Sequence, residues 1–171
     1  MRKLPTTLES KMKIRFQDCD PYGHLNNSKY IDYIMTARGD QLIEFYDFDI
    51  YKMAQQAKLG WVAAQTQISY LHPAHIMEEV IIQTQLIQSG EKSLVVEAIM
   101  WNHNKSVAKA LMWGKLVHYN LQTKKSQNHA EELKQFFKQI INPLKEDLSF
   151  EQRAMFLKNS VSKEDNKTMA N

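Results

Sequence analysis

The chain has 171 residues, of which 43% are hydrophobic, and its 22 Lys and Arg residues against 19 Asp and Glu residues give a net charge of +3. A chain of this length and composition can bury a core as one domain, which excludes intrinsic disorder as its main state. The charge is small and evenly mixed, so no nucleic-acid partner is expected. The one cysteine, Cys19, excludes an intrachain disulfide and a cysteine-based zinc site.

The first thirteen residues contain no apolar segment typical of a secretory signal. No apolar run approaches the ~18 residues of a membrane span. The sequence therefore predicts a cytoplasmic protein with no membrane partner.

The N-terminal part predicts a strand followed by a long helix. Apolar and charged residues alternate over 11–16, the pattern of a half-buried strand. Asn26 and Asn27 are good N-cap residues, and apolar residues then recur every three to four positions. We expect a helix over 28–46 that is buried around much of its circumference.

The next seventy residues predict strands, at 62–70, 79–87, 93–101 and 106–121. On the last of these, Ala108, Ala110 and Gly114 share one face, where small residues would let the long helix approach closely. One strand, one long helix and four strands predict an α+β fold in which an antiparallel sheet wraps around a single central helix.

From Lys124 the character of the sequence changes, and we divide the chain into a domain at 1–124 and a C-terminal helical extension at 125–171. An amphipathic pattern predicts a helix over 131–141, and Ser149 with Gln152 forms a capping-box pattern before a second helix. The polar end, 159–171, is expected to be a frayed, disordered tail.

The segment from Asp18 to Tyr30 contains the candidate catalytic residues. Two carboxylates lie just upstream of a helix start, whose unpaired N–H groups and partial positive charge suit a developing oxyanion. An Asp side chain, with a pKa near ~3.9, is ionised at neutral pH and available as base or nucleophile. The two features together supply parts of acyl-transfer chemistry, but Asp and Asn before a helix are also ordinary capping residues. The residues alone leave both interpretations open.

A resemblance favours the catalytic interpretation. Asp18–Tyr30 resembles the opening motif of the 4-hydroxybenzoyl-CoA thioesterase family of hotdog-fold enzymes, D-x-D-x-x-G-H-x-N-N-x-x-Y. The similarity continues through 68–74, where the family often has a strand that ends in Tyr-x-x-Pro, and covers roughly 11–121. It implies a hotdog fold for the domain at 1–124, a thioester hydrolase that acts on acyl-CoA without a cofactor or metal, and a homodimer or tetramer with active sites at the dimer interface. Acyl carrier protein thioesters are a variant substrate.

The resemblance also assigns residues. Asp20 would be the nucleophile or the general base on a water, and the backbone N–H near Asn27 would polarise the carbonyl. His24 would line the acyl pocket or brace Asp20, and Lys92 would contact the CoA phosphates. Candidate substrate-binding residues are thus His24, Asn26, Tyr30 and Lys92. Each also has a structural interpretation: a structural hydrogen bond for His24, a cap for Asn26, the core for Tyr30 and a solvated surface position for Lys92.

Other groups in the sequence are assigned structural roles. Asp18 suits a turn or cap, and Cys19 lacks a paired base. His72 and His75 do not suit a metal pair, because Pro73 prevents a helix and positions three apart on a strand face opposite sides.

Two other functions remain as alternatives: a non-catalytic acyl-CoA-binding or sensing module, and a hydroxyacyl-thioester dehydratase. The C-terminal extension departs from short family members. Its apolar stripe, at Leu133, Phe136, Phe137 and Ile140, could pack on the outer face of the sheet, cover the acyl pocket or join a contact between dimers.

Overall fold

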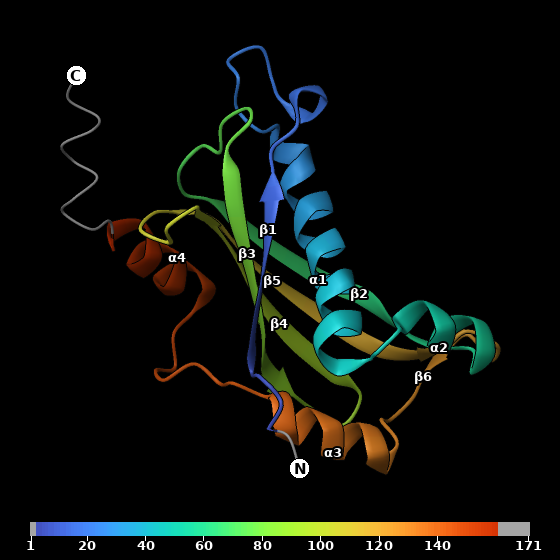
Figure 1. The fold of residues 1–171 in the computed structure, drawn as a ribbon. Coiled ribbons are helices and arrows are strands. Elements are labelled where there is room, and N and C mark those ends of the chain that lie inside the picture. The colour runs from blue at the N-terminus through green and yellow to red at the C-terminus, as the bar shows by residue number, and fades with distance from the viewer. Residues whose placement is uncertain (1–2, 161–171) are drawn as a thin grey trace.

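The computed structural model describes residues 3–160 as a curled antiparallel sheet with one long helix along its concave face (Figure 1). The strands follow the order β1-β3-β4-β5-β2, with β6 added to β5. The elements, in chain order, are β1 (Thr7–Lys13), α1 (Tyr30–Tyr46), α2 (Ile50–Gln56), β2 (Leu59–Tyr70), β3 (Glu79–Ser89), β4 (Ser93–Asn102), β5 (Ala108–Asn120), β6 (Lys125–Ser126), α3 (Glu131–Ile140) and α4 (Phe150–Asn159). This arrangement confirms the predicted α+β class and the central helix.

The main core lies between α1 and the concave face of the sheet. Tyr33, Ile34 and Ala37 of α1 pack among apolar side chains of β3, β4 and β5. Among residues 3–160, the other side of α1 is only partly covered, since Gly39 is buried there but Met35 is 48% and Ile43 is 41% exposed. The helix is therefore buried mainly on one side, and not around much of its circumference as the sequence predicted.

The first strand differs from its prediction in position. It runs over Thr7–Lys13 and pairs with β3, whereas Phe16 falls in a short 3-10 helix and is 76% exposed. The alternating pattern ends at Ile14, which is buried in the main core. Alternation alone did not show that the chain leaves the sheet after that residue.

The prediction for the last strand is wrong in two respects: Ala108 does not share the face of Ala110, and no helix packs closely against Gly114. The β4–β5 register shifts beside Met100 and Trp101, and this irregularity turns Ala108 to the outer face of the sheet while Ala110 stays in the main core. At Gly114, a Cβ atom would meet no atom within 4 Å, so this glycine borders open space and not a closely packed helix.

Helix α2 was not predicted from the sequence. The Asp49 side chain accepts hydrogen bonds from the N–H groups of Tyr51 and Lys52, at 3.0 Å each, and so caps its first turn. An aspartate ahead of a short apolar stretch was the available signal. The helix begins just after the left-handed residue Asp47 ends α1.

The C-terminal extension forms the two expected helices, and the capping box of Ser149 and Gln152 is present. Helix α4 packs on the outer face of the sheet through Phe150, Ala154 and Leu157. Arg153 of the same helix makes a two-pronged ion pair with buried Glu97, at 2.9 and 3.0 Å. The predicted tail falls mostly on 161–171, outside the described residues.

Among residues 3–160, none of the helices combines the length and the apolar character that crossing a membrane requires. The cytoplasmic location, the division at residue 125 and the absence of a nucleic-acid partner remain predictions.

Candidate active site

The loop before α1 is held by Asp20. One carboxylate oxygen of Asp20, Oδ1, accepts hydrogen bonds from the N–H groups of Tyr22, at 2.9 Å, and His24, at 3.0 Å. The Asp20 N–H donates to the His24 carbonyl at 2.8 Å, and Gly23, between them, adopts a positive φ of 75°. A residue without a side chain suits that conformation. The loop thereby fixes Oδ1, while Oδ2 has no hydrogen bond to the described residues.

Asn26 and Asn27 form the start of the helical segment. The Asn26 side chain accepts a hydrogen bond from the Ser28 N–H at 3.0 Å and caps a 3-10 turn, Asn27–Lys29, that leads into α1. Asn27 occupies the first position of that turn, where no carbonyl of the helix reaches its N–H. The hydroxyl of Tyr70, at the end of β2, donates to the Asn27 carbonyl at 3.0 Å and fixes the peptide group.

Asp20, Asn27 and Tyr70 border a cavity of about 320 Å³, called here the polar cavity, which Asn26 does not line. It lies at the N-terminal end of α1 and is lined by Asp20, His24, Leu25, Asn27, Tyr30, Tyr70, Leu71, His72 and Pro73. Four predicted site residues, Asp20, His24, Asn27 and Tyr30, thus lie together. The Asp20 carboxylate and the start of a helical segment thus border the same cavity.

His24 and Tyr30 reach the polar cavity in different ways. The His24 N–H braces Asp20, and its ring packs edge-on against His75 with centroids 5.0 Å apart. The Tyr30 hydroxyl accepts a hydrogen bond from the Ala74 N–H at 3.1 Å, and burial raises the pKa of this phenol. Tyr30 is 2% exposed, so it forms a wall of the cavity as well as part of the core.

Lys92 lies at the other end of the sheet from Asp20. On β5, Ala110 pairs with Tyr70 beside the polar cavity, whereas Val117 pairs with Ser93 next to Lys92. Seven residues of strand span about 23 Å. The Lys92 ammonium donates to the Ser126 hydroxyl at 3.5 Å. Within one chain, therefore, the structure does not bring Lys92 to the other site residues.

Asp18 and Cys19 do not line the polar cavity. The Asp18 carboxylate accepts a hydrogen bond from the Tyr33 hydroxyl at 2.7 Å and so ties the loop to α1. Burial and the carboxylates of Asp18 and Asp20 raise the pKa of the Cys19 thiol, which donates to the Arg15 carbonyl at 3.4 Å. A thiol held protonated is a poor nucleophile.

Sequence reasoning missed Tyr70 and His72 as cavity residues. Both follow from the Tyr-x-x-Pro pattern, which we used only as a sign of the end of a strand. His72 has a buried Nε2 with no hydrogen-bond partner among residues 3–160. Its position beside Asp20 depends on how β2 meets the loop, which no local pattern reveals.

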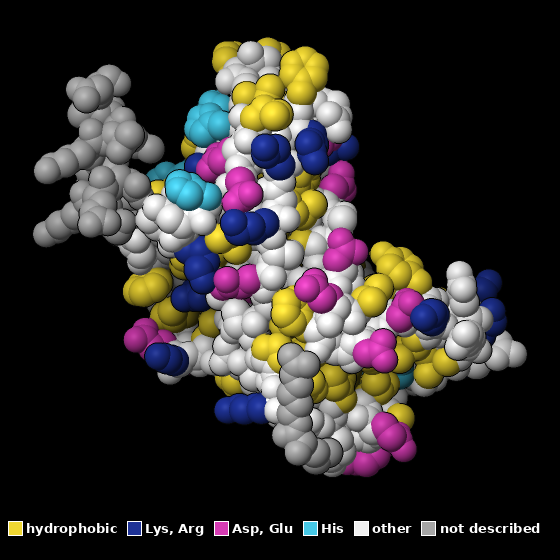
Figure 2. Space-filling view, in the orientation of Figure 1, with side chains coloured by type: hydrophobic (Ala, Val, Ile, Leu, Met, Phe, Trp, Pro, Cys, Tyr) yellow, Lys and Arg dark blue, Asp and Glu magenta, His cyan; other side chains and the backbone are white. Residues whose placement is uncertain are grey.

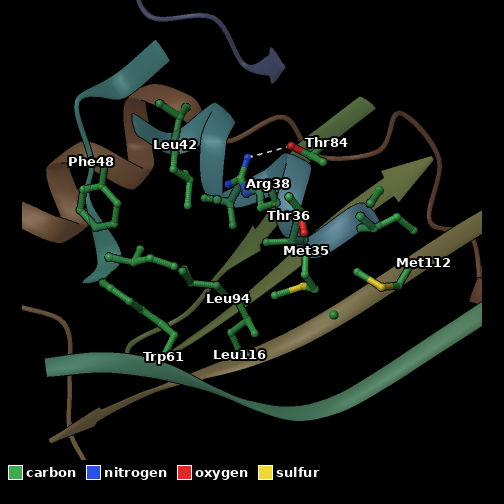
Figure 3. Close-up of a pocket in the computed structure, with 18 of the residues that line it drawn as sticks. Met35, Thr36, Arg38, Leu42, Phe48, Trp61, Thr84, Leu94, Met112 and Leu116 are labelled. Carbon is green, nitrogen blue, oxygen red and sulfur yellow. Dashed lines mark hydrogen bonds between the residues drawn. The ribbon is translucent and has the colours of Figure 1, made fainter. Parts of the chain in front are cut away.

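A second cavity, of about 460 Å³, lies farther along α1 on the concave side of the sheet (Figure 3). We call it the apolar cavity, because Leu42, Phe48, Trp61, Leu94, Met112 and Leu116 point into it from α1, the segment after α1, β2, β4 and β5. Phe136, Phe137 and Ile140 of α3 close its end. Of the three positions considered for the extension, the structure thus places α3 over a cavity and α4 on the outer face.

The family model of the Thioesterase-like superfamily matches residues 14–137. The long-chain acyl-CoA thioesterase FadM of Escherichia coli (strain K12) is 26% identical over 136 residues, which cover 78% of this chain and 99% of that protein.

Two solved structures have the same fold. The probable thioesterase YbaW from Escherichia coli matches with a TM-score of 0.68 and 24% identity, over 78% of this chain and 98% of that one. A member of the thioesterase superfamily from Jannaschia sp. CCS1 matches with a TM-score of 0.73 and 14% identity, over 83% of this chain and 99% of that one. These likenesses confirm the predicted hotdog fold.

Proposed function

Because the chain belongs to the thioesterase-like superfamily and is a thioester hydrolase, we propose that it hydrolyses acyl-CoA at the polar cavity, with Asp20 as the catalytic carboxylate. One observation carries the assignment of the site. Asp20 and Asn27, from the two ends of one loop, line the same cavity, and among residues 3–160 no ion pair neutralises Asp20.

The chemistry follows from these two groups. The thioester carbonyl oxygen accepts a hydrogen bond from the Asn27 N–H, which stabilises negative charge as the carbonyl carbon becomes tetrahedral. Asp20 either removes a proton from the attacking water or attacks the carbon itself to give an anhydride that water then hydrolyses. The C–S bond breaks, and CoA leaves as a thiolate, with an ordinary thiol pKa of about 8.5 and hence little need for an acid. The products are a carboxylate and CoA.

The acyl chain has a path along α1. The apolar cavity begins near Asp32 and Met35, just beyond the polar cavity on the same helix. Its volume and apolar walls suit an aliphatic chain, and the relative FadM is a long-chain acyl-CoA thioesterase. We therefore propose an aliphatic acyl group as the substrate, carried by CoA, with the acyl carrier protein thioester as the variant.

We propose that two copies assemble through β2. Within the described part of the chain, 3–160, this strand pairs with β5 alone and its other edge has no neighbouring strand, and residues 62–66 in its middle are exposed. Antiparallel pairing of two β2 edges would bring Lys92 of the partner subunit toward Asp20, as a phosphate-binding role requires. A dimer in sedimentation velocity is the expected result, and a monomer that retains full activity would contradict this assembly.

Apolar side chains also gather at the tip of the molecule, over the loop before α1 and the β2–β3 connection (Figure 2). Tyr22 is 84% exposed there, and Met77 is 58% exposed. This exposed surface next to the polar cavity is available to cover a bound acyl-CoA or to meet the partner subunit.

Two substitutions at one position separate catalysis from loop structure. In Asp20→Asn, the amide oxygen still accepts the hydrogen bonds from Tyr22 and His24, but the negative charge is gone. In Asp20→Ala, both the charge and the hydrogen bonds are lost. We expect Asp20→Asn to lower acyl-CoA hydrolysis at least about a hundredfold, measured as free thiol released, with an unchanged melting temperature.

The control is Asp18→Asn, two residues away, which removes a neighbouring negative charge that does not line the polar cavity, while its amide oxygen still accepts the hydrogen bond from Tyr33. It should keep most of the turnover. If Asp20→Asn retains wild-type turnover while Asp20→Ala loses it, Asp20 serves only as a loop cap.

A further inference from the structure

A guanidinium group lies in the wall of the apolar cavity. Arg38 extends from α1 toward β3, where its Nη1 donates a hydrogen bond to the Thr84 hydroxyl at 3.0 Å (Figure 3). The Thr84 hydroxyl donates in turn to the side chain of buried Gln41, and Gln41 donates to the Ile82 carbonyl at 2.9 Å. This chain of bonds fixes one edge of the guanidinium, and the other N–H groups of this cavity-lining side chain have no hydrogen-bond partner among residues 3–160.

Arg38 has no anionic partner among residues 3–160. Its one hydrogen bond is to Thr84, and it takes part in none of the ion pairs. Asp32 is the one carboxylate that lines the same cavity, but its side chain is exposed and pairs with Lys29 at 3.4 Å. Burial lowers the pKa of the Arg38 guanidinium to about 10, so the group remains protonated at neutral pH.

A purely hydrocarbon ligand would be a poor complement to this wall. Filling the cavity with methylene groups would remove water from a cation and supply nothing in its place, which is unfavourable. A carboxylate would instead accept two parallel hydrogen bonds from the planar guanidinium. The positive charge of Arg38 therefore favours a chain that carries a carboxylate over a hydrocarbon chain of equal length.

We propose that the ligand of the apolar cavity is an aliphatic chain that carries a carboxylate, and that this carboxylate pairs with Arg38. The inference rests on the proposed function for the position of the chain. Arg38 follows Asn27 by eleven residues, about 16 Å along a helix, so a chain of medium length held at Asn27 can reach it. The carboxylate has two sources: the distal end of a dicarboxylic acyl thioester, or a free fatty acid that enters by its head group.

The test compares two thioesters of equal length. Dodecanedioyl-CoA and dodecanoyl-CoA are assayed with the wild type, Arg38→Met and Arg38→Lys, and the ratio of their kcat/KM values is taken for each protein. We expect the ratio to favour the dicarboxylic substrate in the wild type and to fall at least about tenfold in Arg38→Met, mainly through KM. Arg38→Lys, which keeps the charge, should retain part of the ratio. Lys115→Met, which removes an exposed cation of β5 outside this cavity, should leave it unchanged.

Calorimetric binding of free dodecanedioate and dodecanoate to Asp20→Asn, with and without Arg38→Met, separates this inference from the proposed function. Binding that depends on Arg38 supports the inference even if the wild type hydrolyses neither thioester. If the affinity for dodecanoate depends on Arg38 while the kcat/KM ratio of the two thioesters is the same in all variants, the inference holds and the carboxylate is that of a free fatty acid. If the kcat/KM ratio is the same in all variants and the affinities of both free acids are unchanged by Arg38→Met, the inference is wrong, but the proposed thioesterase function is not affected. A change only in the oligomeric state of Arg38→Met would also overturn it, because the partner subunit would then neutralise the charge.

Discussion

The two cavities on α1 are built in opposite ways. The polar cavity, of about 320 Å³, is formed mainly by the loop before the helix and by the end of β2, and its polar groups lie close together in the sequence. The apolar cavity, of about 460 Å³, draws side chains from two helices near its mouth, four strands and α3. Chemistry is thus encoded locally, whereas the shape that receives the ligand is a property of the whole fold.

This difference predicts two kinds of defect. The loss expected for Asp20→Asn is the largest and should be the same for every acyl chain, because the carbonyl carbon is common to all of them. A variant in the apolar cavity should instead change activity only for chains long enough to reach it.

Gly114→Val provides such a variant. A Cβ atom at Gly114 meets open space in the apolar cavity, so the valine side chain fits the strand and occupies volume that the acyl chain needs. We expect kcat/KM for hexadecanoyl-CoA to fall about tenfold, with the value for butanoyl-CoA within about twofold of wild type. A chain-length series of acyl-CoA thioesters measures this.

The matched control is Gly60→Val on β2. A Cβ atom at Gly60 also meets nothing within 4 Å, but Gly60 does not line the apolar cavity. Its chain-length profile should match that of the wild type. An equal loss for butanoyl-CoA and hexadecanoyl-CoA in Gly114→Val would show that the acyl chain lies elsewhere.

The smallest expected effect is a dependence of stability on pH near the apolar cavity. His129 accepts a hydrogen bond from the indole of Trp61, at 3.1 Å, and its ring packs against Phe137. Burial lowers the pKa of His129 below its ordinary value of 6.5, so the unfolded state binds a proton first as the pH falls. The free energy of unfolding should therefore decrease below about pH 6.5, by at most about 1.4 kcal/mol per pH unit from this group.

Urea unfolding at pH 7 and pH 5 measures this effect, with His129→Gln compared with the wild type. The decrease should be smaller in His129→Gln, whereas His103→Gln, at an exposed position, should behave as the wild type does. Equal decreases in all three proteins would assign the pH dependence to other groups.

The features that sequence reasoning predicted well are those with local causes. The long helix ends at Tyr46 as predicted, because apolar spacing and end residues are readable from the chain itself. Asp20, His24 and Asn27 line one cavity because a single short loop carries them. The two helices of the extension follow from amphipathic spacing and a capping box.

The features that it missed depend on contacts between distant segments. The register shift beside Met100 places the Ala108 side chain on the outer face of the sheet, and no residue pattern within β5 predicts it. Arg38 falls inside the predicted helix at 28–46, and its contact with Thr84 of β3 follows only from the tertiary fold. Lys92 was grouped with Asp20 by resemblance, but strand register separates them within one chain.

The ion pair between Glu97 and Arg153 has a consequence for assembly. Glu97 is 1% exposed and also accepts hydrogen bonds from Trp113 and Gln85, so removing Arg153 would strand a charge in the interior. Helix α4 is thus fixed to the convex side of the sheet and covers the apolar side chains of Ile99, Ala108 and Leu111 there. Any molecule that packed against these residues would first have to displace α4, at the cost of leaving the Glu97 carboxylate without its cation.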